Sequence, residues 1–412
     1  MLRRSRILIY GLNFAPEPTA TGKYTAELAQ WLAHAGHDVR AICAPPYYPN
    51  WSVATPYSSW RYGQERWEGV RVFRAPIWVP QRPSGGKRML HLASFAVSSL
   101  PLLLQNLAWR PHLIFCVAPT LMCAPGAAAF ARLSGSMSWL HVQDFEVDSA
   151  FELGLLRGPR MHRAASNIER ILFRSFDRVS SISQRMVAWL REKGVAPGRA
   201  LLFPNWVDTD AIRPMSYYSS YRRDLGIPQS AFVALYSGTM GLKQGLEVLA
   251  ETAGRLAEQT NIHFIFCGQG AGYEELRNVC AGMRRVHWLP LQPAERLSEL
   301  LSTADVHLLP QKRAAADFVL PSKLTGMLAS GRPVLSTADP GTELAEWIEG
   351  CGDIVEPGDG AALAQRLLAL SRDLQRCRDL GACARTRALT RLSRDIVMER
   401  FCKDLDEALA AR

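Results

Sequence analysis

The chain has 412 residues, of which 48% are hydrophobic and 21% are charged, and its formal net charge is +10. This composition excludes a disordered protein, and the length is sufficient for two domains of ordinary size. The positive charge favours an anionic partner, namely a nucleotide phosphate, a nucleic acid or a membrane surface, without choosing among them.

The nine cysteines are scattered along the chain, and no CxxC pair that would indicate a zinc site occurs among them. Most lie in apolar stretches, so we expect reduced thiols and a cytoplasmic protein. The basic N-terminus leads directly into the short apolar run at 6–11, which is too short for the apolar core of a secretion signal.

The first half of the chain alternates short apolar runs with helical patterns, which indicates a parallel sheet covered on both faces. The predicted strands are 7–11, 38–43, 113–117, 138–142, 178–182 and 201–203, and the predicted helices are 22–34, 120–133, 168–176 and 184–193. One long, mostly apolar helix is predicted at Met89–Trp109. It carries His91 and Pro101, so we expect a buried or membrane-surface helix rather than a spanning one.

This alternation breaks at 204–208, and the polar stretch 210–229 marks a domain boundary. The same pattern then restarts, with strands predicted at 232–237, 263–267, 286–289, 306–309, 334–336 and 353–355, and helices near 245–258, 273–280 and 294–301, followed by a helical tail. We therefore expect domains at 1–204 and 205–390, and a helix at 391–412 for which a return to the first domain is one option. Two doubly wound domains bind ligands in the cleft between the carboxyl ends of their strands.

The stretch Leu309–Thr337 predicts a diphosphate site. Strand, loop, helix and strand follow in close order, with Ser322 suited to the helix N-cap and Gly331 to its C-cap. A helix N-terminus attracts phosphate through its free N–H groups, and Lys323 in the first turn adds a full positive charge. Because any αβ unit contains a capped helix, this prediction depends on other sites.

Three loops with glycine follow predicted strands. Gly22 begins the first helix, where a plain βα loop is the alternative, and the stretch 237–245 contains both Gly238 and Gly241 and the nearby Lys243. Gly268 opens a further cluster, for which a tight turn is the alternative. The chain has no GxGxxG and no Walker loop. Together with Lys323, these sites predict a nucleotide diphosphate in a two-domain cleft.

Carboxylates gather after the predicted strand 138–142. Asp144 comes first, and Glu146 and Asp148 follow closely. A carboxylate in this position would act as a base or stabilise a developing cationic sugar. A structural helix cap is the competing role.

With these sites in place, the chain resembles glycosyltransferase family 4, and most closely its colanic-acid (WcaI-like) branch. The stretches that carry the resemblance are YGLNFAPEPTATGKYTAELAQWLAHAGHDVRAICAPPYYPNW, LHVQDFEVDSAFELG, FPNWVDTDAI, YSGTMGLKQGLEVL and VLPSKLTGMLASGRPV. They are spread over nearly the whole chain. The resemblance implies the α/β GT-B fold, in which two Rossmann-like, doubly wound parallel-sheet domains face a central cleft.

The resemblance further implies retaining transfer of a sugar from a nucleotide-sugar, of the GDP-fucose type or another, to a lipid-linked oligosaccharide in exopolysaccharide synthesis at the inner membrane face. It implies no cofactor and no metal, because basic side chains and helix N-termini carry the charge of the departing diphosphate. On this sequence those groups would be Lys243, Ser322, Lys323 and the backbone of Gly22, with Asp144 as the carboxylate of the first domain.

The chain departs from the family in two places. The paired glutamates near the donor sugar would fall at about Phe318 and Gly326, neither of which is acidic, although Asp317 is adjacent to the first. The usual histidine before the first-domain aspartate is Gln143 here. The contacts inferred from those glutamates are therefore not carried over, whereas the diphosphate site is.

Basic and aromatic residues cluster in the first domain. They are Trp51, Trp60, Arg61, Arg66, Trp67, Trp78, Arg82, Lys87, Arg88 and Trp109. Such a cluster suits a bilayer interface that holds a lipid-diphosphate acceptor, and aromatic core residues with a solvated basic rim are the alternative. For the whole protein the alternatives are a nucleotide-sugar epimerase of GT-B shape and a basic nucleic-acid-binding protein. The sequence shows few acid/base candidates for the former and no binding module for the latter, so no nucleic-acid partner is expected.

Overall fold

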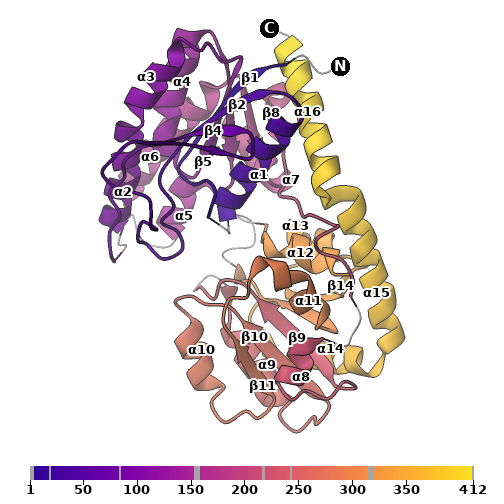
Figure 1. The fold of residues 1–412 in the computed structure, drawn as a ribbon. Coiled ribbons are helices and arrows are strands. Elements are labelled where there is room, and N and C mark those ends of the chain that lie inside the picture. The colour runs from indigo at the N-terminus through magenta and orange to yellow at the C-terminus, as the bar shows by residue number, and fades with distance from the viewer. Residues whose placement is uncertain are drawn as a thin grey trace. The chain divides into compact units, whose positions relative to one another are not determined.

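The computed structural model describes residues 4–17, 20–82, 85–152, 158–215, 219–241, 244–313 and 320–410. The chain divides into two compact units, Met1–Pro204 together with Met398–Arg412, and Asn205–Val397. Each unit is built on one sheet with helices on both faces (Figure 1).

The first unit contains an eight-stranded sheet in the order β3-β4-β2-β1-β5-β6-β7-β8. The strands are β1 (Arg6–Gly11), β2 (Asp38–Cys43), β3 (Gly63–Trp67), β4 (Val70–Arg74), β5 (Leu113–Ala118), β6 (Met137–Val142), β7 (Arg178–Ser181) and β8 (Ala200–Leu202). All neighbours are parallel except β3 and β4, which form an antiparallel hairpin at one edge. The strand order reverses between β1 and β5, and ligands of such sheets bind at the carboxyl ends of the strands at this switch point.

Helices cover both faces of the first sheet. They are α1 (Ala20–His34), α2 (Gly85–Ser98), α3 (Leu100–Leu107), α4 (Ala124–Ser134), α5 (Glu146–Glu152), α6 (Pro159–Arg174) and α7 (Gln184–Glu192), joined by the C-terminal helix α16 (Arg394–Ala410). Helices α3, α4 and α6 lie on one side of the sheet, and α1 and α16 lie on the other (Figure 1). The buried side chains of α3 and α4, including Leu103 and Phe130, join one apolar core with Tyr10 and Leu140 of the sheet.

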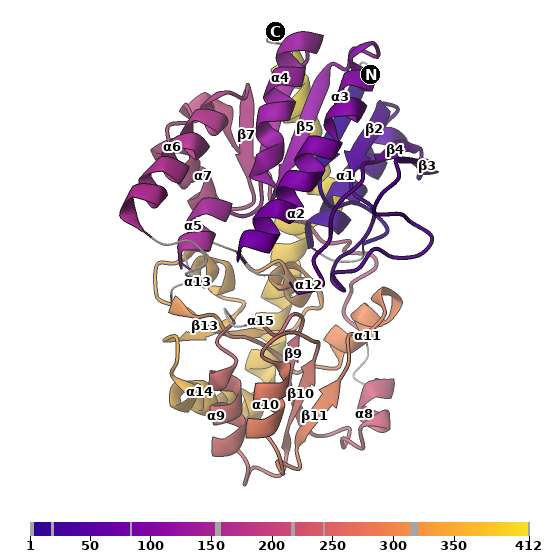
Figure 2. The ribbon, with the colours of Figure 1, turned by 90° about the vertical axis from the view of Figure 1, so that its left-hand side faces the viewer.

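The helix expected at Met89–Trp109 is present as the helical stretch Gly85–Leu107, in which α2 and α3 follow one another along one side of the first unit (Figure 2). Pro101 stands in the first turn of α3. Proline has no N–H to donate and its ring clashes with the preceding helical turn, so the sequence favours a new helix start here. Ser99, between α2 and α3, keeps a helical backbone, so the predicted helix is confirmed apart from this interruption.

The second unit contains a six-stranded, fully parallel sheet in the order β11-β10-β9-β12-β13-β14. The strands are β9 (Phe232–Ser237), β10 (Ile262–Cys267), β11 (Val286–Leu289), β12 (Val306–Leu309), β13 (Val334–Thr337) and β14 (Gly352–Val355). The helices are α8 (Ser220–Asp224), α9 (Glu247–Arg255), α10 (Tyr273–Val279), α11 (Leu297–Ser302), α12 (Lys323–Ala329), α13 (Glu343–Ile348), α14 (Gly360–Arg372) and α15 (Leu374–Arg387). One apolar core joins the sheet to α9, α10 and α14, and another joins it to α11, α12, α13 and α15. The switch point lies between β9 and β12.

The C-terminal helix α16 completes the core of the first unit. Phe401 is buried, and its ring centroid lies 5.5 Å from that of Phe115, 5.1 Å from that of Trp139 and 4.5 Å from that of Phe203. Aromatic rings at these separations attract each other beyond the area they bury. The last part of the chain therefore belongs to the first unit, although the chain enters α16 from the second.

Candidate functional site

Two glycine loops interlock at the carboxyl end of the second sheet. Gly238 follows β9 and Gly268 follows β10, with φ of 125° and 145°, values that side chains other than glycine rarely allow. A Cβ atom at position 268 would collide with the carbonyl oxygen of Gly238. The loops are joined by the hydrogen bonds from Gly238 N to Cys267 O (2.9 Å) and from Met240 N to Gln269 O (2.8 Å). The two loops therefore lie with their backbones in direct contact, at the carboxyl end of the sheet where ligands of such folds bind.

Lys323 lies beside this pair of loops. Its Nζ donates to the hydroxyl of Tyr236 at 2.9 Å and lies 4.2 Å from the centroid of the same ring. The Lys323 Nζ would be 3.5 Å from a Cβ atom at Gly238. Within the described residues, no carboxylate lies within ion-pair distance of this ammonium group.

Burial lowers the pKa of Lys323 to about 7, because the charged form has lost solvating water. The hydroxyl of Tyr236 donates in turn to the carbonyl oxygen of Thr239 at 2.6 Å, which leaves its oxygen to accept from the lysine. A desolvated ammonium group without a carboxylate partner gains most from an anionic ligand. The local arrangement therefore suits a phosphate group.

Ser322 occupies the N-cap position of α12, but its hydroxyl does not cap the helix. Its backbone is helical, with φ of −60° and ψ of −26°, and the side chain makes no cap hydrogen bond. A serine reaches back to the N2 or N3 amide from an extended backbone, so the expected side-chain cap was wrong. Gly331 follows the helix with φ of 68°, as predicted for its C-terminus.

Not all predicted donor-site residues are part of the described chain. Lys243 and Asp317, together with Phe318, lie outside the described residues. Gly241 ends the described part of the loop after β9, and Gly326 lies within α12. A Cβ atom at Gly326 would lie 3.4 Å from Leu301 Cδ1, so this position faces an apolar neighbour rather than a polar site.

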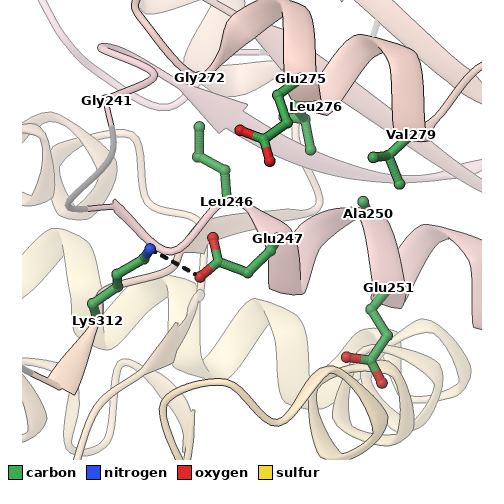
Figure 3. A pocket seen from close by; sticks show the side chains of 10 residues that line it. All are labelled: Gly241, Leu246, Glu247, Ala250, Glu251, Gly272, Glu275, Leu276, Val279 and Lys312. Carbon is green, nitrogen blue, oxygen red and sulfur yellow. Dashed lines mark ion pairs between the residues drawn. The ribbon is translucent and has the colours of Figure 1, made fainter.

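A cavity of about 530 Å³ opens next to the glycine loops, between α9 and α10 (Figure 3). Gly241 and Gly272 form part of its wall, and its charged side chains are Glu247, Glu251, Glu275 and Lys312. Lys312 is already paired with Glu247 at 3.1 Å. Three carboxylates around one paired lysine disfavour an anion, so this cavity suits a phosphate less well than the surroundings of Lys323 do.

A smaller cavity, of about 170 Å³, lies at the switch point of the first sheet. Residues that follow β1, β5 and β6 line it, including Gly22, Thr120 and Glu146. Glu146 Oε2 accepts a hydrogen bond from the backbone N–H of Leu121 at 2.6 Å. Burial raises the pKa of Glu146 to about 7 despite this bond. The predicted Gly22 and one of the carboxylates noted in the sequence thus line the same cavity.

The other two carboxylates near β6 lie in different surroundings. Asp148 forms an ion pair with Lys193 at 2.7 Å, and Lys193 also binds the buried Glu169 at 2.5 Å, so this carboxylate ties α5 to α6 and the end of α7. Asp144 is half-buried just beyond β6, next to Gln143, whose Oε1 accepts from Thr21 Oγ1 at 3.5 Å. Asp144 therefore keeps the position that the sequence predicted for it, at the carboxyl end of a strand.

The basic and aromatic cluster is divided in the structure. Trp60 is 79% exposed, whereas Trp67 packs edge-on against Phe14 at 5.4 Å and Trp109 is covered by Arg40 at 4.0 Å. The basic residues Arg61, Arg66, Arg82, Lys87 and Arg88 are all exposed. The cluster is thus partly core and partly surface.

Tyr236, His91 and Thr120 were not predicted as site residues from the sequence. Tyr236 lies inside a buried strand and His91 inside an apolar helix. The available signal for both was a polar residue within an otherwise apolar run.

All nine cysteines carry free thiols. Among the described residues, no three His, Cys, Asp or Glu side chains gather in a group that could hold a metal ion.

Models of known glycosyltransferase families match both units. A glycosyl transferase 4-like domain covers residues 19–206, and a glycosyl transferases group 1 domain covers residues 231–373. A protein of Escherichia coli (strain K12), provisionally named as the colanic acid biosynthesis glycosyl transferase WcaI, is 42% identical over 97% of this chain and 99% of its own length.

Solved structures show the same fold at low sequence identity. Sucrose-phosphate synthase of Thermosynechococcus elongatus has a TM-score of 0.78 at 18% identity, covering 99% of this chain and 100% of its own. HepE of Anabaena, solved with UDP and glucose, has a TM-score of 0.70 at 15% identity, covering 98% and 100%. The expected fold class is confirmed, and the chain belongs to the GT-B glycosyltransferases of family 4.

Proposed function

We propose that this glycosyltransferase transfers a sugar, with retention of configuration, from a nucleotide-sugar to a lipid-linked oligosaccharide in colanic-acid-type exopolysaccharide synthesis. The donor is GDP-fucose or another nucleoside-diphosphate sugar. The relative named for colanic acid synthesis supports the pathway, and the HepE structure with UDP and glucose supports a nucleotide-sugar donor. The second unit holds the donor and the first unit holds the acceptor.

The observation that carries this proposal is the ammonium group of Lys323, which lies beside the loop of Gly238, donates to Tyr236 and has no carboxylate partner among the described residues. A diphosphate placed there meets a positive charge at the carboxyl ends of β9 and β10. As the bond from the sugar to the diphosphate breaks, negative charge grows on the leaving oxygen, and a preorganised cation stabilises it. From their positions in the sequence, we assign Lys243, Ser322, Asp317 and Gly241 to the same donor site. No metal and no cofactor is needed, because these groups carry the leaving charge.

A thermal-shift panel of UDP, GDP and their sugars tests the donor site. We expect stabilisation by one nucleoside diphosphate, with an affinity about 10- to 100-fold lower in Lys323→Ala, the range for loss of one charge-assisted hydrogen bond. Lys403→Ala, which removes a 77% exposed lysine from α16, is the matched control and keeps the shift. Transfer of label from the stabilising donor into the lipid phase of a membrane extract, undiminished by EDTA, tests the reaction. Strong, salt-sensitive binding to nucleic acid without any nucleotide shift would contradict the proposal.

The acceptor side of the proposal places the protein at the cytoplasmic face of the inner membrane. Helices α2 and α3 expose several large apolar side chains, with Leu90 at 57%, Val97 at 67% and Leu104 at 61%. Lys87 and Arg88 are exposed at the start of the same stretch. By length and composition, Gly85–Leu107 would be sufficient to span a membrane, and part of it is buried in the first unit. An apolar face next to basic residues is typical of helices that lie on an anionic bilayer.

Co-sedimentation with vesicles tests this contact. The protein is expected to bind vesicles that contain anionic lipid more strongly than neutral ones, and the double variant Leu90→Glu, Leu104→Glu is expected to lose this binding. Leu133→Glu is the matched control, because Leu133 on α4 is 71% exposed and lies outside the stretch. Equal loss in the control, or binding that persists in the double variant, would contradict the membrane assignment.

A further inference from the structure

His91 lines the cavity of about 170 Å³ in the first unit, and one of its ring nitrogens has no hydrogen-bond partner among the described residues. His91 is 1% exposed, and its Nδ1 lies 2.7 Å from the carbonyl oxygen of Trp78. Because a carbonyl oxygen only accepts, Nδ1 carries the hydrogen, and Nε2 presents a lone pair. This Nε2 is buried and has no hydrogen-bond partner among the described residues. Burial lowers the pKa of His91, which keeps the ring neutral.

A second polar atom in the same cavity is also unpaired. Thr120, directly after β5, is 0% exposed, and its Oγ1 has no partner in the described part of the chain. Buried polar atoms are nearly always hydrogen-bonded, and each one left unpaired destabilises the fold. Two such residues on the wall of one small cavity therefore indicate a ligand whose polar groups form the missing hydrogen bonds.

The walls of the cavity identify the chemistry of this ligand. Tyr47 and Trp51 also line it, and their rings pack against His91 with centroid separations of 4.7 Å and 5.4 Å. One acidic side chain, Glu146, and one basic side chain, Arg88, both line it, so the cavity does not favour an anion over a neutral group. Flat aromatic faces together with a lone pair, a hydroxyl and a carboxylate fit a ring that carries several hydroxyl groups. The volume is below the roughly 300–1,000 Å³ typical of drug-sized ligand sites, so it fits one ring.

We propose that this cavity binds one sugar ring of the acceptor, with His91 Nε2, Thr120 Oγ1 and Glu146 hydrogen-bonded to its hydroxyl groups. This inference rests on the proposed function. Lys323, to which the donor's diphosphate is assigned, lies in the second unit. Gly22, which the resemblance also assigned to the diphosphate, lines this cavity, so the acceptor assignment moves Gly22 to the acceptor side. Moreover, the helix that supplies His91 is α2, which also exposes Leu90 on the proposed membrane face, where a lipid-linked acceptor is anchored.

The variant Thr120→Val distinguishes binding from packing. Valine has nearly the shape of threonine and removes only the unpaired hydroxyl, so the variant is expected to fold with a thermal midpoint equal to or above that of the wild type. If Thr120 binds the acceptor, the half-saturating amount of a detergent extract of native membranes rises about 3- to 10-fold, the range for loss of one neutral hydrogen bond, while the donor KM is unchanged. His91→Ala is expected to act in the same direction.

The control is Thr252→Val in the second unit, whose buried Oγ1 already donates to Val248 O at 2.7 Å. It is expected to lose thermal stability and keep the acceptor dependence. A donor KM that rises in Thr120→Val while the acceptor dependence stays fixed would assign the ring to the donor and overturn the inference. No kinetic change, with a raised thermal midpoint, would overturn it as well. If the wild type shows neither a nucleotide shift nor transfer, the proposed function fails instead, so the two failures are distinguishable.

Discussion

Binding of a nucleoside diphosphate is expected to take up a proton through Lys323. Burial lowers the pKa of this ammonium group from 10.5 to about 7, so at pH 8 only about a tenth of the molecules carry its charge. A diphosphate beside Nζ favours the charged form and restores the pKa towards or above its ordinary value. About 0.9 proton is therefore expected to enter on binding at pH 8, because the charged fraction rises from about a tenth to nearly one.

The free energy available from this coupling follows from the same shift. The difference between the pKa values of 10.5 and about 7 corresponds to about 5 kcal/mol at 1.36 kcal/mol per pH unit. This free energy is the upper limit of what the interaction of the diphosphate with the charged lysine can contribute to binding through the pKa shift. Calorimetric titration with UDP and with GDP is done in buffers of different ionisation enthalpy. The number of protons taken up is the slope of the observed binding enthalpy against the ionisation enthalpy of the buffer. A pH of 8 avoids the titration of the terminal phosphate itself, whose second pKa is about 6.

The control for proton uptake is Lys323→Arg. Arginine remains charged at every accessible pH, so this variant is expected to bind the nucleotide with a slope near zero. If wild type takes up no proton at pH 8, or if Lys323→Arg takes up as much as wild type, then the buried ammonium group is not the one that meets the diphosphate.

Burial raises the pKa of Glu146 to about 7, so between pH 4.5 and 7 the folded protein keeps a proton that the unfolded chain has released. The free energy of unfolding is therefore expected to fall by up to about 3 kcal/mol as pH rises through this range. Urea midpoints measured across the range should depend less on pH in Glu146→Gln than in the wild type. Lys193→Met leaves the buried Glu169 unpaired and is expected to cost about 3–5 kcal/mol in a thermal melt, with much of the loss recovered by adding Glu169→Met. Phe401→Ala removes a buried ring from the first unit and is expected to cost about 3–5 kcal/mol; a loss below about 1 kcal/mol would show that α16 contributes little to that core.

The sequence predicts the buried strands well, because their apolar runs are continuous. The predicted strands 232–237, 286–289 and 306–309 coincide with β9, β11 and β12. Strand β3 was not predicted, because it lies at the sheet edge with mostly exposed side chains; it is held by the ion pair of Glu65 with the buried Arg74 at 2.6 Å. Strand β4 was missed although it lies inside the sheet and is mostly buried. Edge strands without apolar alternation give no periodic signal.

Only part of the candidate site follows from the sequence. The glycines after β9 and β10 and the lysine after Ser322 are recognisable because small residues after parallel strands are a local pattern. The contact of Lys323 with Tyr236 joins positions 87 residues apart, and no local pattern contains it. The unpaired atoms of His91 and Thr120 are equally invisible in the sequence, since lacking a partner depends on the entire folded environment.

Because α16 packs on the first unit, that unit is built from two separate parts of the chain. A fragment that stops at Pro204 would lack Phe401 and would leave the rings of Phe115 and Trp139 uncovered on one sheet face. Such a truncated half is expected to aggregate, and a synthetic peptide of residues 394–410 should rescue its solubility by complementation. Independent production of the first unit therefore requires a circular permutation that joins the C-terminal segment to the N-terminus, rather than a single cut in the gene.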